Sequence, residues 1–196
     1  MKFAAHIYLW TQGWADAEVG LFARVKTLGV DLLEIAVGED VPFDAALTRR
    51  AAADAGMGIV IGPGGQWPDG ADLSDDEPAN RQLAFDWHRK QIDLAAALGA
   101  LGYSGAIYGR PGKVLRRRPP ADELARTAEG LHGLAEYAQQ AGVALAIERP
   151  LRPEGPGNLQ AGAGDTRYAA AAALAEPRQA TIVTGHTADD QVETVL

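Results

Sequence analysis

The sequence predicts an α/β fold, an incomplete (β/α) barrel of the TIM type with five to six parallel strands and outer helices. Short apolar runs alternate along the chain with longer segments of helical spacing. The runs are apolar almost throughout, which is typical of parallel strands buried on both faces. Because crossovers between parallel strands are right-handed, the helices then cover one side of a curling sheet. A doubly wound sheet stays open on pattern alone, although residues 11–14 lack its glycine-rich phosphate turn.

The elements follow from apolar spacing and from the residues that end them. Five runs predict strands, at residues 3–10, 30–37, 58–61, 103–108 and 143–147. Four segments predict helices that stop at a following glycine, at residues 16–28, 44–55, 78–98 and 121–141. Later in the chain we expect a helix at 158–175, a sixth strand at 180–184 and a last helix at 187–196.

The composition is that of an ordinary globular protein. Its 196 residues suffice for one well-buried domain, or for one domain with a small appendage. The net charge of −8 argues against a nucleic acid or an anionic membrane as partner, and the basic run 116–118 predicts a solvated loop. The chain has no cysteine and no apolar stretch typical of a signal peptide or a membrane span. A cytoplasmic protein is therefore expected.

A change of composition divides the chain after residue 148. Residues 150–157 hold three prolines and two glycines, which is typical of a linker or irregular loop. We therefore expect a partial barrel over residues 1–154 and an appended helix–strand–helix segment over residues 155–196. The pattern stops at residue 196 without a helix cap. A fused or truncated, non-catalytic product is thus one interpretation of the chain.

Polar and aromatic residues gather where the predicted strands end. In a β/α barrel the functional side chains stand at these carboxyl ends and in the loops that follow them. Carboxylates, an arginine and several aromatic rings at one rim suit a small polar ligand with apolar ring faces, such as a sugar. The candidates are His6, Trp10, Trp14, Glu34, Gly62, Pro63, Trp67, Tyr108, Arg110, Glu148, Arg152 and Glu154.

Several of these side chains also have structural interpretations. Glu34 stands in an apolar strand, where a carboxylate is costly to bury unpaired, so it is either paired with Arg or Lys or functional. Glu148 directly follows an apolar strand, where packing gives no reason for a carboxylate. His6 is either a core histidine whose hydrogen bonds are made within the protein or a residue that contacts the ligand. Trp87 and His88, inside a long predicted helix, are expected to serve packing and surface roles.

Motifs along most of the chain carry a family resemblance. They are AAHIYLWTQGW, VKTLGVDLLEIAV, IGPGG, ADLSDDEPANRQ, YSGAIYG, ADELARTAEGLHGLAEYAQQAGVALAIE and RPLRPE. Together they resemble the D-tagatose/D-allulose 3-epimerase family of ketose epimerases, within the sugar isomerase/epimerase barrels of the xylose isomerase type. The resemblance implies an isomerase that acts on a small-molecule sugar.

This resemblance assigns roles residue by residue. Glu148 matches the glutamate that binds the divalent metal and acts as one of two catalytic bases. Arg152 and Glu154 match the Arg-x-Glu motif that follows it, whose glutamate contacts substrate hydroxyls. The remaining substrate-binding positions that it implies are His6, Trp14, Glu34 and Gly62.

The chemistry that the resemblance implies is epimerisation at C3 through an enediolate. A Mn²⁺ or Mg²⁺ ion binds the ketose oxygens, one carboxylate removes the C3 proton, and a second returns a proton on the opposite face. The family takes its other ligands, an aspartate, a histidine and a second catalytic glutamate, from strands six to eight. The Asp-x-x-His motif of strand six is absent here. Only Glu148 of the four ligands is assigned, so an incomplete active site is expected.

The tail resembles a different family. The stretch GNLQAGAGDTRYAAAAAL followed by TIVTGHTADDQVETVL is similar to tRNA(Ile)-lysidine synthetase, although that family's phosphate-binding Ser-Gly-Gly-x-Asp-Ser loop is missing. An alternative is therefore that the chain is a fragment of an ATP-dependent tRNA-modifying enzyme. The net negative charge of the chain argues against binding of tRNA. A further hypothesis pairs 180–184 beside the fifth strand and makes His186 a stand-in metal ligand.

Open sheet edges predict self-association. Six parallel strands cannot close an eight-stranded barrel, so edges stay exposed unless another copy covers them. We therefore expect a homo-oligomer or a poorly soluble chain.

Overall fold

The computed structural model describes residues 3–64, 66–110, 112–113 and 117–147, together with Ala169 and Ala173. Internal contacts divide the chain into two units, Lys2–Glu148 and a second formed by Met1 with Arg149–Leu196. The sheet and its helices belong to the first unit. Among the described helices, none combines the length and apolarity that a membrane span requires.

Five parallel strands form one sheet in the order of the chain, β1-β2-β3-β4-β5. Their bounds are β1 (Ala4–His6), β2 (Leu32–Ala36), β3 (Gly58–Gly62), β4 (Gly102–Gly105) and β5 (Ala144–Ile147). Each strand pairs in parallel with the next one in sequence. This is the order of a barrel wall, whereas a doubly wound sheet reverses its order at a switch point. The predicted barrel-type α/β fold is therefore confirmed over these strands.

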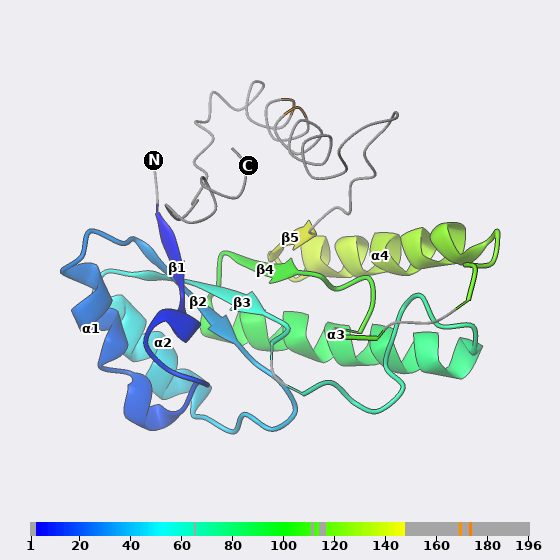
Figure 1. Ribbon diagram of the computed structural model, residues 1–196. Coiled ribbons are helices and arrows are strands. Elements are labelled where there is room, and N and C mark those ends of the chain that lie inside the picture. The colour runs from blue at the N-terminus through cyan, green and yellow to red at the C-terminus, as the bar shows by residue number, and fades with distance from the viewer. Residues whose placement is uncertain are drawn as a thin grey trace, which may run out of the picture. The chain divides into compact units, whose positions relative to one another are not determined.

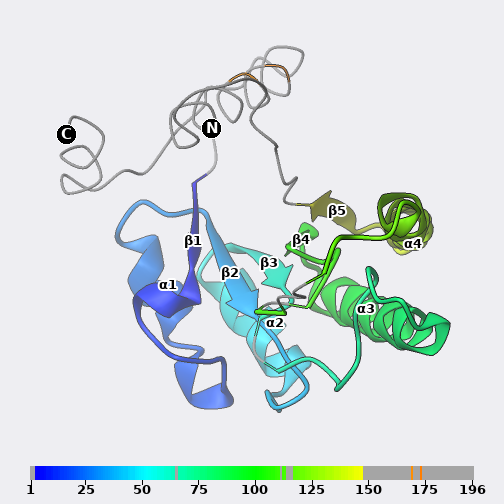
Figure 2. The same ribbon diagram turned by 45° about the vertical axis from the view of Figure 1, so that its right-hand side comes forward.

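The helices run along the outside of this sheet (Figures 1 and 2). Their bounds are α1 (Leu21–Lys26), α2 (Ala45–Asp54), α3 (Pro78–Leu98) and α4 (Glu123–Gln140). They pack in sequence order, α1 on α2, α2 on α3 and α3 on α4. The long α3 begins at Pro78, where a missing N–H is harmless, and ends at Gly99, whose φ of 66° is left-handed.

Strand β2 explains why the two faces of the sheet differ. Leu33 and Ile35 are fully buried and share one core with Phe22 of α1. Leu32 and Glu34 alternate with them, so they lie on the opposite face and are partly exposed. We call this opposite face, which carries Glu34, the inner face of the sheet.

The chain after β1 differs from the strand predicted at 3–10. The strand ends at His6 and a 3-10 helix follows at Ile7–Leu9. The reason is local, because His6 Nδ1 accepts the N–H of Tyr8 and so turns the backbone away from the sheet.

Other predicted elements are shorter than expected or lie outside the described residues. The segment 16–28 divides into a 3-10 helix and α1. The strand predicted at 103–108 ends at Gly105, whose φ of 139° few other residues adopt. The elements expected at 158–175, 180–184 and 187–196 lie outside the described residues, except that Ala169 and Ala173 are helical.

Candidate functional site

The carboxyl ends of the strands bring three of the predicted site residues to one edge of the sheet. His6 ends β1, Glu34 lies in β2 and Gly62 ends β3. His6 pairs with Glu34 across the first two strands, and Ala36 pairs with Gly62 across the next two. We call His6, Glu34 and Gly62 the edge group.

Glu34 lies directly over Gly62. Its Oε1 atom is 2.9 Å from the position that a Cβ on Gly62 would occupy, and the Ser104 carbonyl oxygen is 3.5 Å from the same point. Any side chain at residue 62 would therefore push against the carboxylate. Among the described residues, no Lys or Arg is paired with Glu34 and no hydrogen bond reaches it. Because Glu34 is partly exposed on the inner face, its carboxylate is able to accept hydrogen bonds from a ligand.

His6 is held in a defined orientation. Its Nδ1 atom accepts the backbone N–H of Tyr8 at 3.1 Å. A neutral imidazole that accepts at Nδ1 carries its proton at Nε2. The ring is partly exposed, so Nε2–H is a donor placed one strand away from the Glu34 acceptor.

Trp14 does not join the edge group, in contrast to the role expected for it. Its indole is 3% exposed and donates to Thr48 Oγ1 of α2 at 3.0 Å. The ring packs edge-on against Phe22 of α1, with 5.4 Å between the ring centroids. Trp14 therefore fills the core between two helices in this structure, and its N–H is already satisfied.

The later rim residues are engaged within the protein. Trp67 is 5% exposed and donates its indole N–H to the Pro63 carbonyl at 2.7 Å. Arg110 binds Asp69 at 3.0 Å. Four predicted residues, Glu148, Arg152, Glu154 and His186, lie outside the described residues. Glu148 follows the last residue of β5 in sequence.

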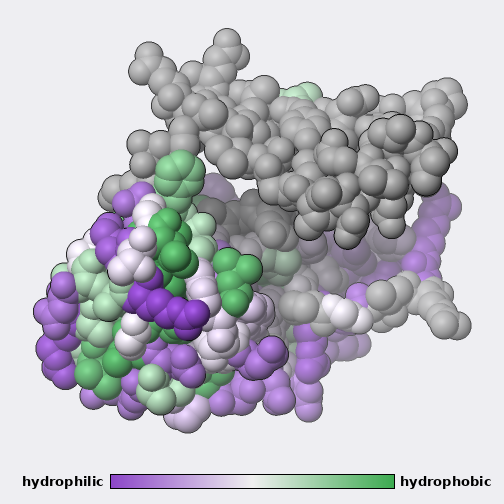
Figure 3. Space-filling view, turned by 60° about the vertical axis from the view of Figure 1, so that its left-hand side comes forward, coloured by the Kyte–Doolittle hydropathy of each residue, from purple (hydrophilic) through white to green (hydrophobic). Residues whose placement is uncertain are grey.

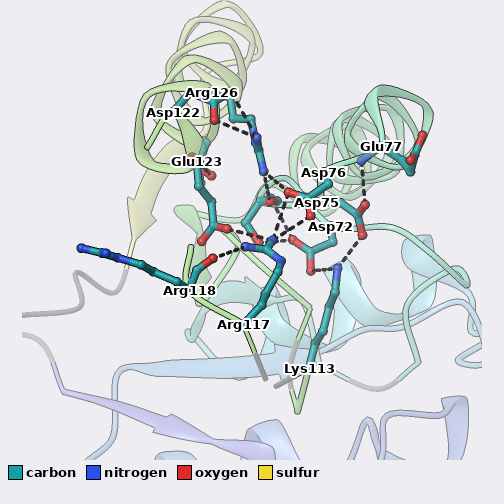
Figure 4. Close-up of polar contacts among 12 residues, drawn as sticks. Asp72, Asp75, Asp76, Glu77, Lys113, Arg117, Arg118, Asp122, Glu123 and Arg126 are labelled. Atoms are coloured by element: carbon teal, nitrogen blue, oxygen red, sulfur yellow. Dashed lines mark hydrogen bonds and ion pairs between the residues drawn. The ribbon is translucent and has the colours of Figure 1, made fainter. Parts of the chain in front are cut away.

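A network of ion pairs joins the loop after β3 to the loop after β4 and to α4 (Figure 4). Lys113 binds Asp72 Oδ2 at 3.0 Å and Asp75 Oδ2 at 2.5 Å. Asp72 is 2% exposed, and its other oxygen accepts both the N–H and the hydroxyl of Ser74. A buried carboxylate with this many partners ties the two loops together.

Burial and hydrogen bonds shift the pKa values of Asp75 and Lys113 in opposite directions. Burial raises the pKa of Asp75, but hydrogen bonds from Lys113 and from the Glu77 N–H outweigh it and lower the pKa below its usual value. Burial likewise lowers the pKa of Lys113, whereas Asp75 and Asp72 raise it by more. Both groups are therefore charged at neutral pH.

Two arginines extend the network toward α4. Arg117 binds Asp76 and Glu123, and Arg126 binds Asp76 and Asp122. The Arg118 side chain points away from the cluster in Figure 4. The loops after β1, β2 and β3 contain no Lys or Arg in their sequence, between residues 7–20, 37–44 and 63–77. The edge group is thus bordered by acidic and neutral residues.

The described residues alone do not form a metal site. Within them, no group of three or more His, Asp or Glu side chains is arranged to hold an ion. His6 and Glu34 supply one imidazole and one carboxylate, which is too few for a Mn²⁺ or Mg²⁺ site built from protein ligands.

Sequence reasoning missed Tyr8 and the His88–Tyr103 pair. Tyr8 stands two residues after His6, so the period of a strand would have placed both on one face, but it was assigned only to the strand interior. His88 was expected in a packing or surface role and is fully buried, with Nδ1 2.7 Å from the Tyr103 hydroxyl. The available signal in the sequence was that His88 directly follows Trp87, and in the structure the rings of Trp67 and Trp87 both pack against it.

Several known proteins are similar to the chain in sequence. A ketose 3-epimerase of Arthrobacter globiformis is 28% identical over 150 residues, which are 76% of this chain and 50% of that protein. An L-ribulose 3-epimerase of Mesorhizobium japonicum is 26% identical over 148 residues, 75% of this chain and 49% of that protein. The chain therefore spans about half the length of the curated relatives it matches.

Solved structures share the fold. D-allulose 3-epimerase from Methylomonas sp. in complex with D-allulose superposes with a TM-score of 0.66 at 23% identity, over 75% of this chain and 50% of that one. The structure of an L-ribulose 3-epimerase gives the same TM-score of 0.66 at 25% identity, over 75% of this chain and 49% of that one. Both resemblances cover about half of the length of the solved chains.

The family assignment rests on a match that extends through most of the chain. The model of the xylose isomerase-like TIM barrel family matches residues 22–176. This range includes residues 155–176, which were predicted to belong to the appended segment. The similarity of residues 157–196 to tRNA(Ile)-lysidine synthetase stays a prediction. The chain belongs to the xylose isomerase-like TIM barrel family.

Proposed function

We propose that this chain carries the amino-terminal half of a ketose 3-epimerase site, in which the carboxyl ends of its strands bind the sugar. The observation that carries the proposal is that the Glu34 acceptor lies over Gly62 and that His6 stands at the paired position of the adjacent strand. A ketose presents both donors and acceptors on neighbouring carbons, so a carboxylate and an imidazole N–H at adjacent strands suit it. The names of the relatives, ketose and L-ribulose 3-epimerase, support the same substrate class.

The charges at this edge favour a neutral sugar over a phosphorylated one. Phosphate groups are usually bound by Arg or Lys side chains or by a helix N-terminus. Four cations of the loop after β4 and of α4, Arg110, Lys113, Arg117 and Arg126, are each bound to carboxylates. The Glu34 carboxylate would repel a phosphate. We therefore propose an unphosphorylated ketose as the substrate.

Glu148 is the base in this proposal. Its carboxylate takes the proton from C3, and the electron pair of that C–H bond forms the C2=C3 double bond of an enediolate while the carbonyl π pair moves onto the C2 oxygen. An acid on the opposite face then returns a proton to C3 as the carbonyl re-forms. Inversion therefore requires an acid on the face opposite Glu148. As the family resemblance implies, Arg152 and Glu154 form the substrate-binding Arg-x-Glu motif, in which Glu154 contacts the substrate hydroxyls.

A divalent ion is part of the proposal as the group that would polarise the ketose carbonyl. Glu148 is its proposed ligand, and His186 is a second, weaker candidate. Because the described residues do not form a metal site by themselves, binding has to be measured directly. Calorimetric titration with MnCl₂ of the wild-type chain, Glu148→Gln and His186→Ala tests both assignments. Equal Mn²⁺ affinity in the wild type and a variant removes that residue from the ligand set.

The activity is tested with D-fructose, D-tagatose and D-psicose in the presence of Mn²⁺. Conversion between C3 epimers by the 196-residue chain that is lost in Glu148→Gln would support Glu148 as the base. Glu129→Gln, at an exposed position of α4, is the matched control and should convert at the wild-type rate. Absence of conversion in every chain contradicts catalysis by this polypeptide alone, and the binding experiment below then decides whether the sugar site exists.

A further inference from the structure

Tyr8 lies beside the edge group and holds its histidine. The Tyr8 backbone N–H donates to His6 Nδ1 at 3.1 Å, and the two rings lie 4.3 Å apart with an angle of 58° between their planes. Despite these contacts the Tyr8 residue is 52% exposed. The tyrosine is therefore fixed at its base while much of its side chain faces outward.

The hydroxyl end of Tyr8 reaches the loop after β3. Tyr8 Oη lies 3.0 Å from the position that a Cβ on Gly64 would occupy, and that position also lies against the Cβ of Ala36. Ala36 is the last residue of β2, the strand that carries Glu34. The Tyr8 side chain thus extends from the end of β1 across the end of β2 to the loop after β3.

We propose that Tyr8 is a specificity-determining residue of the ketose site, in which its ring covers the sugar bound at Glu34 and contacts the C–H groups of one sugar face. The inference rests on the proposed function. An aromatic ring supplies apolar area to a ligand that is otherwise polar. Because the contacts with His6 already orient the ring, little conformational entropy is lost when a ligand binds.

The proposal predicts discrimination between epimers. D-fructose and D-psicose differ in configuration at C3, so one of them turns a hydroxyl and the other a hydrogen toward a ring placed on one face. The ring favours the epimer that presents the hydrogen, because a hydroxyl against an aromatic face loses hydrogen bonds to water. Removal of the ring should weaken binding and bring the two affinities closer together.

The surface around β1 offers a matched control. Phe3 is also aromatic, is also 52% exposed and precedes the same strand at its amino end. In Figure 3 apolar residues are interspersed with polar ones over this side of the molecule. Loss of Phe3 therefore removes a similar exposed ring without touching the carboxyl edge.

The experiment is an NMR titration of the ¹⁵N-labelled 196-residue chain with D-fructose and with D-psicose. We expect Tyr8→Ala to weaken the affinity for the preferred epimer about tenfold, an effect of the size that a lost aromatic contact gives, and to reduce the ratio between epimers. Tyr8→Phe should stay within about twofold of wild type because the ring remains. Phe3→Ala should bind as wild type does, and a ¹³C-labelled Tyr8 ring should shift on binding.

The outcomes separate this inference from the proposed function. If Tyr8→Ala keeps the affinity and the epimer ratio of the wild type while Glu34→Gln abolishes binding, the proposed role of Tyr8 is wrong. The sugar site at Glu34 is then still supported. Equal losses in Tyr8→Ala and Phe3→Ala also overturn it, since the effect would then not depend on the carboxyl edge. No binding of either sugar to the wild type overturns both.

Discussion

His88 Nδ1 and the Tyr103 hydroxyl oxygen lie 2.7 Å apart behind the sheet, where both side chains are fully buried. Burial raises the pKa of Tyr103 well above its usual value, so the phenol stays protonated. Burial lowers the pKa of His88 to about 4, although the Ile107 carbonyl acts in the opposite direction. A neutral imidazole therefore joins α3 to β4, with Trp67 and Trp87 packed around it.

The first prediction is a loss of stability in mild acid that depends on His88. The unfolded chain takes up the proton near pH 6.5, whereas the folded chain does so only near pH 4. Stability from the neutral ring is therefore fully present above pH 6.5 and is lost as the pH falls from 6.5 toward 4. The full difference corresponds to roughly 3 kcal/mol.

Urea denaturation at several pH values between 7 and 4 measures this effect, with His88→Asn as the control that cannot titrate. We expect the free energy of unfolding of the wild type to fall more steeply with decreasing pH than that of His88→Asn. Parallel curves for the two proteins would show that His88 does not take up its proton on unfolding in this range.

The second prediction concerns the hydroxyl of Tyr103. Tyr103→Phe leaves the ring in place but removes the partner of a buried nitrogen, which costs about 1–3 kcal/mol of unfolding free energy. Tyr137→Phe is the control, because Tyr137 donates to Asp93 in an exposed hydrogen bond at 2.6 Å and its loss should cost about 0.5–1 kcal/mol. If both variants lose the same stability in chemical denaturation, burial does not strengthen the His88–Tyr103 contact.

The third prediction concerns the ion-pair network. Lys113→Met removes the cation bound to Asp72, whose side chain is 2% exposed, and leaves Ser74 as the partner of that carboxylate among the described residues. We expect a loss of roughly 2–4 kcal/mol, because breaking a buried pair strands the other charge. Lys26→Met, which removes an exposed pair with Asp31 at 3.6 Å, should cost under about 1 kcal/mol. Equal thermal or urea stability of the two variants would contradict the burial of this pair.

The fold was predictable from the sequence because its signal is local and repeated. Each of the first four apolar runs is followed in the sequence by a helical segment and a glycine, and α3 begins and ends at the predicted residues Pro78 and Leu98. The end of β1 was not predictable in the same way. It depends on one side chain, His6, which accepts a backbone N–H and ends the strand within a run of apolar residues.

The candidate site was predictable only where a strand position fixes it. His6, Glu34 and Gly62 follow from the carboxyl ends of neighbouring strands, so the register of the sheet brings them together. Trp14 stands in a loop, where its direction depends on a partner 34 residues away, Thr48. The spacing of apolar residues along the chain does not reveal a contact between residues this far apart. The sequence therefore predicted a rim position for Trp14, whereas the structure places its side chain in the core.

The fourth prediction is self-association of the 196-residue chain. In the described sheet β1 and β5 each pair with one neighbour, and unpaired strand edges favour association with other chains. Size-exclusion chromatography with light scattering should give a mass above 20.6 kDa for one chain. A sharp monomer peak with cooperative unfolding would contradict this.

The fifth prediction is that Gly62→Ala impairs sugar binding without unfolding the protein. The new Cβ would stand 2.9 Å from Glu34 Oε1, closer than such contacts allow, so the carboxylate has to move. Because Glu34 is partly exposed and its end is flexible, the free energy of unfolding should change by less than about 1 kcal/mol. The affinity for the ketose should fall about tenfold, since the acceptor is displaced.

Two further variants decide whether Glu34 transmits the effect of Gly62→Ala. Gly20→Ala places its Cβ where nothing lies within 4 Å and should bind the sugar as the wild type does. Glu34→Asp added to Gly62→Ala withdraws the carboxylate by one methylene and makes room for the new methyl group. Partial recovery of affinity in this double variant, measured against Glu34→Asp alone, would show that the glycine is required by the carboxylate above it. An equal loss in both backgrounds would show that Gly62 acts on the site independently of Glu34.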